Sequence, residues 1–220
     1  MSAGDVRRAR MVRDLQARGL TDPRVLSAMG QIPREPFVEE ALRTKAYDDA
    51  ALPIGEKQTI SQPYIVAKMC ELTQPDGSGR VLEIGSGSGY HAAVLSRLFE
   101  QVYSVERIAS FSKRAREAVR ALAIENVHFK IFDGSYGWSE FAPFRAIVVT
   151  AAAPEVPAPL LEQLENGGRL VLPIGAAGPA SSDAAEQTLI RVLKDAEGFR
   201  REEHGPCRFV PLLGKFGWTG

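Results

Sequence analysis

The sequence lacks an excess of charge of either sign, and it lacks any long apolar run. Its 220 residues hold 27 lysines and arginines against 27 aspartates and glutamates, so the formal net charge is zero. A protein that binds nucleic acid through the phosphates normally carries a basic excess, so this class is not expected. The longest stretches without a charged residue, Ile84–Ser96 and Leu170–Ser182, span 13 residues each, fewer than the ~18 that a membrane helix needs. We therefore expect a globular protein without nucleic-acid or membrane partners, and no secretory signal at Met1–Arg10.

Cysteine and histidine are also scarce, and neither shows the spacing of a metal site. The two cysteines, Cys70 and Cys207, form no Cys-x-x-Cys pair, and the three histidines are scattered along the chain. A single disulfide would be an unusual scaffold for a chain of this length. We therefore expect two reduced thiols, a cytoplasmic location and no bound metal.

The order of the expected elements indicates an α/β fold. The first 60 residues carry apolar positions at loosely helical spacing, with a helix start at Asp22-Pro23 and an irregular stretch over Tyr47–Thr59. A helix from Ser61 leads into strands that alternate with helices, which predicts a parallel sheet covered on both faces. The expected strands are Arg80–Ile84, Val102–Val105, Val127–Phe132, Ala146–Thr150, Arg169–Pro173, and an antiparallel pair, Thr188–Leu193 and Arg208–Leu212. The fold class is thus a doubly wound, mostly parallel seven-stranded sheet with an antiparallel edge pair and a short helical N-terminal extension.

The segment Val81–Tyr90 joins a strand to a helix through the turn Gly85-Ser86-Gly87-Ser88-Gly89. Glycines in such a turn let the backbone approach a ligand, because no Cβ stands in the way. Glu106 follows 21 residues after Gly85, at the end of the next strand, where a carboxylate accepts hydrogen bonds from the hydroxyls of a ribose. A plain structural turn is the alternative, but the loop and the acid together favour a nucleoside-containing cofactor.

Two residues of the same segment narrow the choice of cofactor. A dinucleotide fingerprint, Gly-x-Gly-x-x-Gly, would need its third glycine where Tyr90 stands. Glu83 places negative charge where a pyrophosphate would be repelled, whereas a ligand with an ammonium and a sulfonium would be attracted. These features favour S-adenosylmethionine. Asp133-Gly134, after the third strand, is either an adenine contact or a plain Asp-Gly turn, and we favour the adenine contact.

Several segments resemble one enzyme family. Gln58–Ala67 reads Gln-Thr-Ile-Ser-Gln-Pro-Tyr-Ile-Val-Ala, and further matching segments are Val81–Tyr90, Val105–Arg107, Asp133-Gly134, Val149–Pro154 and Arg208–Leu212. Over about residues 11–213 the chain resembles the protein-L-isoaspartate O-methyltransferases. Thr-Ile-Ser-Gln-Pro is the most specific part, because many methyltransferases share the glycine loop. The resemblance implies transfer of a methyl group from S-adenosylmethionine to the free carboxylate of L-isoaspartyl residues in damaged proteins and peptides, which begins their repair.

The resemblance also implies roles for single residues. Ser61 matches the family's catalytic serine, and Ala51–Gly55 and Phe209–Leu212 match segments that border the substrate cleft. A carboxylate is already ionised near neutral pH, so its methylation needs no general base, and a neutral hydroxyl can orient it. The competing interpretation of Ser61 is a helix N-cap before Pro63. The expected cofactor-binding residues are Thr59, Ile60, Gln62, Glu83, Gly85, Ser86, Gly87, Gly89, Glu106, Arg107, Asp133 and Gly134.

The chain departs from the family's pattern at a few positions. Glu56-Lys57 replaces part of a turn that often contains glycine, His91 stands where bacterial members often have glutamine, and Arg145 stands where an aspartate is common. We interpret His91 as a surface or packing residue. We interpret the basic run at Lys113–Arg116 as a solvated helix face, given the zero net charge.

Two alternatives to the isoaspartyl reaction stay open: a methyltransferase for a small molecule or RNA, and a non-catalytic module that binds S-adenosylmethionine or a damaged peptide. The absence of charge from Gln58–Ala67 disfavours RNA. We expect a monomer with a single domain, in which residues 1–60 form a helical cap, 61–175 the cofactor-binding core and 176–220 the C-terminal antiparallel strands.

Overall fold

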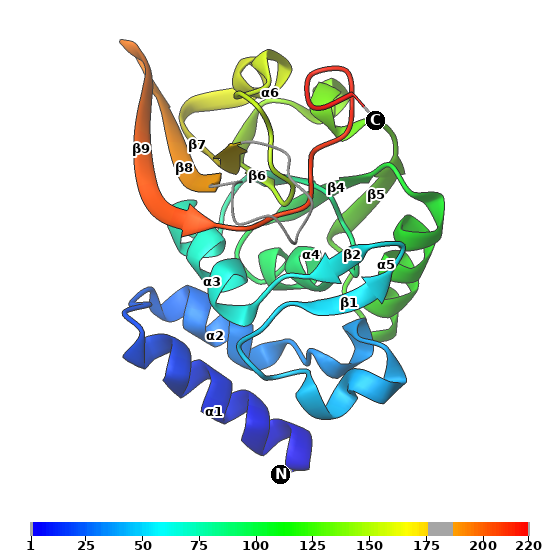
Figure 1. The fold of residues 1–220 in the computed structure, drawn as a ribbon. Helices are drawn as coiled ribbons and strands as arrows, with labels where there is room; N and C mark the ends of the chain where they lie inside the picture. The colour runs from blue at the N-terminus through cyan, green and yellow to red at the C-terminus, as the bar shows by residue number, and fades with distance from the viewer. Residues whose placement is uncertain (1, 176–186, 220) are drawn as a thin grey trace.

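The N-terminal layer of the molecule is helical. The computed structural model describes residues 2–175 and 187–219. Ser2 and Asp5 form a reciprocal capping box that starts the first helix, and the Asp22 carboxylate caps the second, which begins at the predicted Pro23. The elements of this layer are α1 (Ala3–Ala17), α2 (Pro23–Gln31) and two short 3-10 helices, η1 (Glu35–Phe37) and η2 (Glu40–Lys45). Figure 1 shows α1 and α2 stacked at one end of the molecule.

A β-hairpin follows this layer. The expectation of an irregular stretch over Tyr47–Thr59 is therefore wrong in its second half, which forms antiparallel strands β1 (Leu52–Gly55) and β2 (Gln58–Ile60). The turn residues Glu56 and Lys57 have φ angles of 47° and 58°. A two-residue hairpin turn requires such left-handed values, which Asn-Gly normally supplies. Neither Glu56 nor Lys57 is a turn-forming residue type, so the sequence carried no sign of this hairpin.

The main sheet confirms the predicted fold class. Its seven strands have the order β5-β4-β3-β6-β7-β8-β9, with the first five parallel and the last two each antiparallel to the strand before. The strands are β3 (Arg80–Ile84), β4 (Gln101–Glu106), β5 (Val127–Ile131), β6 (Phe144–Val149), β7 (Leu164–Gly175), β8 (Gln187–Asp195) and β9 (Gly198–Cys207).

Helices cover both faces of this sheet, and each face has its own core. Successive strand residues point to opposite faces: Val81 and Val148 belong to one buried cluster, and Leu82 and Ile147 to the other. The helices between the strands are α3 (Pro63–Leu72), α4 (Tyr90–Leu95), α5 (Ala109–Ala121) and α6 (Ala158–Glu162), with 3-10 helices η3 (Gly134–Tyr136) and η4 (Ser139–Phe141). None of the helices in the described residues is long and apolar enough to cross a membrane.

The second strand of the antiparallel pair differs from the prediction. It is Gly198–Cys207, whereas the predicted Arg208–Leu212 lies outside the named strands and makes one isolated bridge, between Pro211 and Ala152. The edge strand β9 is mostly exposed and rich in charge, so it shows no apolar alternation. Phe209–Leu212 is apolar for another reason, because Val210, Pro211 and Leu212 border the pocket described next.

Candidate active site

The candidate site lies at the carboxyl ends of β3 and β6, where the strand order reverses. Ligands of open α/β sheets bind at such a switch point. The turn Gly85–Gly89 begins here, and Thr150, at the end of β6, donates its hydroxyl to the carbonyl of Gly85 (O···O 2.7 Å). Gly85 has φ 97°, and a Cβ there would lie 2.3 Å from Thr150 Oγ1. The first glycine of the loop is therefore required both by the backbone conformation and by the adjacent strand.

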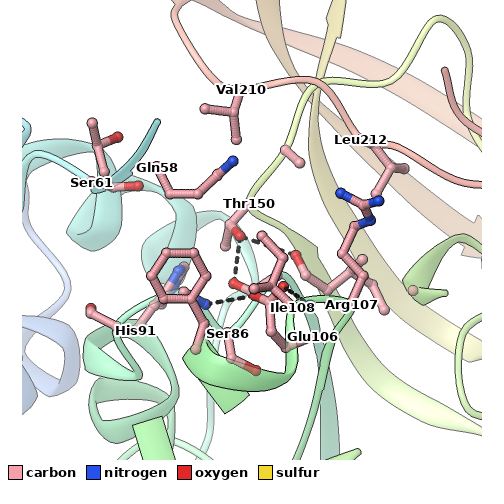
Figure 2. Close-up of a pocket in the computed structure, with 18 of the residues that line it drawn as sticks. Gln58, Ser61, Ser86, His91, Glu106, Arg107, Ile108, Thr150, Val210 and Leu212 are labelled. Atoms are coloured by element: carbon pink, nitrogen blue, oxygen red, sulfur yellow. Dashed lines mark hydrogen bonds between the residues drawn. The ribbon is translucent and has the colours of Figure 1, made fainter. Parts of the chain in front are cut away.

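Glu106 ties the glycine loop to the end of β4. The N–H of Gly87 donates to Glu106 Oε2 (3.0 Å), and the N–H of Ile108 donates to Oε1 (2.9 Å), as the dashed lines in Figure 2 show. A carboxylate has about four acceptor positions, so two remain for a ligand. Glu106 lines the pocket, and its remaining acceptor positions could take hydrogen bonds from ribose hydroxyls.

Glu83 lies buried beneath the loop and does not line the pocket. The hydroxyl of Ser104 donates to Glu83 Oε2, and Ser86 Oγ lies 2.5 Å from Ser104 Oγ. Glu83 Oε1 is buried without a hydrogen-bond partner. Burial raises the pKa of the Glu83 carboxyl to about 8. The carboxyl is therefore mostly protonated near neutral pH, and the expectation that Glu83 places negative charge beside the cofactor does not fit its burial.

Asp133 and Gly134 lie at the other end of the pocket. Asp133 Oδ1 accepts from the N–H of Ser135 (2.9 Å) and Oδ2 accepts from the N–H of Lys215 (2.8 Å). The carboxylate therefore already caps η3 and holds the C-terminal turn. Gly134 lines the pocket, and a Cβ there would lie 2.4 Å from Ile84 Cγ2, so only glycine fits at this wall.

The opposite side of the pocket is formed by Thr59, Ile60 and Ser61, facing the segment Val210–Leu213. Figure 2 shows Ser61 and Gln58 on one side, and Leu212 and Arg107 on the other. The structure separates Ser61 from the capping role: the N-cap of α3 is Gln62, and its side chain makes no capping hydrogen bond.

Asp49 replaces a side-chain cap at this helix. Its Oδ1 accepts from the N–H of Tyr64 (3.0 Å), and its Oδ2 accepts from Gln62 Nε2 (2.8 Å). Gln62 is thus turned toward Asp49 and does not line the pocket. The hydroxyl of Ser61 is not needed to start the helix.

His91, interpreted from the sequence as a surface or packing residue, is packed inside the protein and also lines the pocket. It is buried, and its Nε2 lies 3.3 Å from Cys70 Sγ. Burial lowers the pKa of His91 to about 4 and raises that of the Cys70 thiol well above its usual range. Both groups are therefore neutral near neutral pH, and neither acts as an ionised base or nucleophile.

The basic side chains singled out in the sequence do not line the pocket, and Lys113, Arg114 and Arg116 are exposed, as the interpretation of a solvated helix face expects. Arg145 forms ion pairs with Asp76 and Glu165. On α5, Arg114 donates to the carbonyl of Ile54 (2.9 Å) and Arg116 to that of Phe129 (3.1 Å).

The pocket gathers most of the predicted residues. Nine line it: Thr59, Ile60, Ser61, Gly85, Ser86, Gly87, Glu106, Arg107 and Gly134. Gln62, Glu83, Gly89 and Asp133 stand behind its walls. The sequence did not indicate that the N–H of Ile108 would hold Glu106. It also did not indicate that the Thr150 hydroxyl would hold the glycine loop through the carbonyl of Gly85. A threonine directly after the strand that neighbours the glycine loop was the available signal. In the ranges 2–175 and 187–219, no group of three or more His, Cys, Asp or Glu side chains could hold a metal ion.

The chain is similar to known proteins along nearly its whole length. A family model described as protein-L-isoaspartate(D-aspartate) O-methyltransferase (PCMT) matches residues 6–217. Protein-L-isoaspartate O-methyltransferase 2 of Geotalea uraniireducens (strain Rf4) is 51% identical over 218 residues, 98% of this chain and 97% of its own. A solved protein-L-isoaspartate O-methyltransferase superposes with a TM-score of 0.84 at 34% identity, over 96% of this chain and 67% of that chain. A Plasmodium falciparum structure in complex with S-adenosyl-L-homocysteine shares the fold, with a TM-score of 0.76 and 24% identity over 94% and 98% of the two chains.

Proposed function

The chain belongs to the protein-L-isoaspartate(D-aspartate) O-methyltransferase family, and we propose that it methylates the free carboxylate of L-isoaspartyl residues with Ser61 orienting the acceptor. One observation carries the assignment of Ser61. Its side chain lines the same pocket as Glu106 and the glycine loop, while the helix that follows is capped by Asp49. The serine is thus available to a ligand.

The proposed reaction depends on placing the substrate carboxylate next to the methyl group more than on acid–base catalysis. When bound, S-adenosylmethionine supplies a methyl group on a positively charged sulfur. The substrate carboxylate forms the new bond to the methyl carbon, and the electron pair of the broken bond stays on the donor sulfur. The two opposite charges cancel, so a site shielded from water favours the reaction. Ser61 donates its hydroxyl to one carboxylate oxygen, and Leu212 and Val210 exclude water from the other side.

We assign the cofactor to the side of the pocket opposite Ser61. Glu106 would accept from the ribose hydroxyls, and Gly85, Ser86, Gly87 and Arg107 would surround the rest of the ligand. Thr59 and Ile60 would border the methyl group. Gly134 would lie against the adenine, with Asp133 accepting from its amino group through a remaining lone pair.

Three residues behind the walls have indirect roles in this proposal. Glu83 would act from beneath the loop, through Ser104 and Ser86, whose hydroxyl groups it holds in place. Gly89 lets the loop approach α5, since a Cβ there would lie 2.9 Å from Ala115 Cβ. Gln62 holds the Ser61 segment through its hydrogen bond to Asp49. We further propose a cytoplasmic monomer that acts on polypeptides, which the zero net charge and the free Cys70 and Cys207 support.

The decisive experiment supplies labelled methyl donor and paired peptides that differ only in an aspartyl or isoaspartyl linkage. We expect label only in the isoaspartyl peptide. Equal label in both peptides, or label in neither, contradicts the proposed reaction and would leave the RNA, small-molecule or non-catalytic alternatives.

Ser61→Ala tests the role of the serine within this assay. Losing one hydrogen bond to a charged group should lower kcat/KM roughly 10- to 100-fold, with little change in Tm because Ser61 caps no helix. Ser139→Ala, at an exposed serine in η4, is the matched control and should keep wild-type kcat/KM. Full turnover by Ser61→Ala with a lowered Tm would leave Ser61 a purely structural residue.

A further inference from the structure

Arg34 is a buried arginine directly behind the Ser61 segment. It lies between α2 and η1 and has no exposed surface. Its Nη2 donates to the backbone carbonyl of Ser61 (2.6 Å), and its guanidinium carbon lies 4.7 Å from the centre of the Tyr90 ring. Arg34 thus connects the N-terminal helical layer to the proposed acceptor site, across 27 residues of sequence.

The positive charge of Arg34 has no local counter-charge. Within the described part of the chain no carboxylate forms an ion pair with it, and its Nε and Nη1 are buried without hydrogen-bond partners. The neighbouring Glu35 instead accepts from the hydroxyl of Tyr47 and lies 3.9 Å from Arg7. Burial lowers the pKa of Arg34 only to about 10, so the side chain stays charged near neutral pH.

Burying such an unpaired charge lowers the stability of the folded protein. Moving a charged group out of water without a partner carries a large desolvation penalty, and the contact with the face of Tyr90 offsets only part of it. A group kept in this state is a candidate for a functional role with an anionic ligand. The anion expected at this end of the pocket is the substrate carboxylate, next to Ser61.

We propose that Arg34 is a positioning residue for the methyl acceptor: it fixes the Ser61 backbone and favours a carboxylate over an uncharged group in the acceptor pocket. This proposal rests on the proposed function. The attraction acts on the ionised substrate and vanishes once the carboxylate becomes a neutral ester. Arg34 therefore favours binding of the substrate and release of the product, and its effect falls on KM more than on kcat.

The test measures discrimination between charged and uncharged acceptors. Enzyme loaded with S-adenosyl-L-homocysteine, which cannot turn over, is titrated with an isoaspartyl peptide and with the same peptide carrying a carboxamide in place of the free carboxylate. Wild type should bind the carboxylate more tightly. In Arg34→Met and Arg34→Gln this preference should fall roughly 10-fold, whereas Arg34→Lys should keep most of it.

Two controls separate this role from general damage. Arg24→Met removes another arginine that donates to a backbone carbonyl, that of Pro75, away from the pocket, and should leave the preference unchanged. Affinity for S-adenosyl-L-homocysteine reports folding of each variant. If Arg34→Met does not fold, the comparison of Arg34→Gln with Arg34→Lys decides the question.

The inference is overturned if Arg34→Met or Arg34→Gln discriminates like wild type, or if Arg34→Lys loses the preference as fully as they do. Both results are distinct from failure of the proposed function, because wild-type enzyme would still methylate the isoaspartyl peptide and not the aspartyl one.

Discussion

The two sides of the pocket are built in different ways. The cofactor side consists of strand ends of the main sheet and the loop between β3 and α4, and its key contacts join adjacent strands, as between Gly87 and Glu106. The acceptor side consists of the end of the β1–β2 hairpin and Val210–Leu213, both outside that sheet. Contacts between distant parts of the sequence hold it, such as the one from Arg34 to Ser61.

This difference predicts different sensitivities. The cofactor side is anchored in buried strands, so its shape follows from the fold of the sheet. The acceptor side depends on a few hydrogen bonds. The backbone of Ala152 pairs with Val210 and Leu212. The side-chain amide of Gln187 bonds the backbone N–H and carbonyl of Phe209. Changes far from the pocket should therefore disturb acceptor binding before they disturb cofactor binding.

Glu106→Gln should produce the largest effect, and it should be confined to the cofactor side. The amide keeps the shape but has one acceptor oxygen, so it cannot hold Gly87, Ile108 and a ribose together. Affinity for S-adenosylmethionine, measured by calorimetry, should fall roughly 10- to 100-fold, with peptide KM at saturating cofactor unchanged. Glu125→Gln, at an exposed site, is the control. A loss of cofactor affinity below about twofold would contradict the role of Glu106.

Glu83→Gln tests whether the carboxyl beneath the glycine loop is shielded from water, and its effect should fall on the pH dependence of stability. The pKa of Glu83 is about 8 in the folded protein against 4.5 as the reference value. Between these two pH values the folded state therefore binds one more proton than the unfolded state. The stabilisation that comes from the protonated Glu83 is lost as pH rises from about 4.5 to 8. The loss is at most roughly 1.4 kcal/mol per pH unit. In Glu83→Gln, the free energy of unfolding should change less with pH over this range. An unchanged pH profile would mean that Glu83 is not desolvated.

Lys57→Gly should have the smallest effect, on the acceptor side. Lys57 holds φ 58°, which is strained for a side chain with a Cβ, and glycine should stabilise the protein by about 0.5–1 kcal/mol in chemical denaturation. Ala123→Gly is the matched change, because Ala123 has φ 52° just beyond α5. Both should stabilise the fold, but only Lys57→Gly should alter peptide KM. If Lys57→Gly and Ala123→Gly changed the peptide KM equally, the distinction between the acceptor side and the cofactor side would be wrong.

Local signals in the sequence predicted most of the cofactor side. The glycine turn, the acid at the end of β4 and the alternation of strands with helices each depend on neighbouring residues. The sheet confirms the alternation, and the turn and the acid line one pocket. The hairpin was missed because Glu56 and Lys57 are not turn formers. Strand β9 was misplaced because an exposed edge strand has no apolar pattern.

The acceptor side could be predicted only through family motifs. Thr59–Gln62 has no local feature that separates a helix start from a substrate contact. The structure shows that Ser61 is not the N-cap, because Asp49 caps α3 from outside the helix. Arg34 carried no signal either, because burial of an unpaired charge is a property of tertiary packing and cannot be read from sequence spacing.

The segment Val210–Leu213 follows every other residue that lines the pocket in the sequence, and this has a consequence for the order in which the pocket is completed. During synthesis, the glycine loop, Glu106 and Ser61 all emerge well before the segment that faces them. A chain that stops short of residue 210 would lack the wall that faces Ser61 in the proposed site. In the proposed site this wall is therefore completed last, when Val210 and Leu212 pair with Ala152.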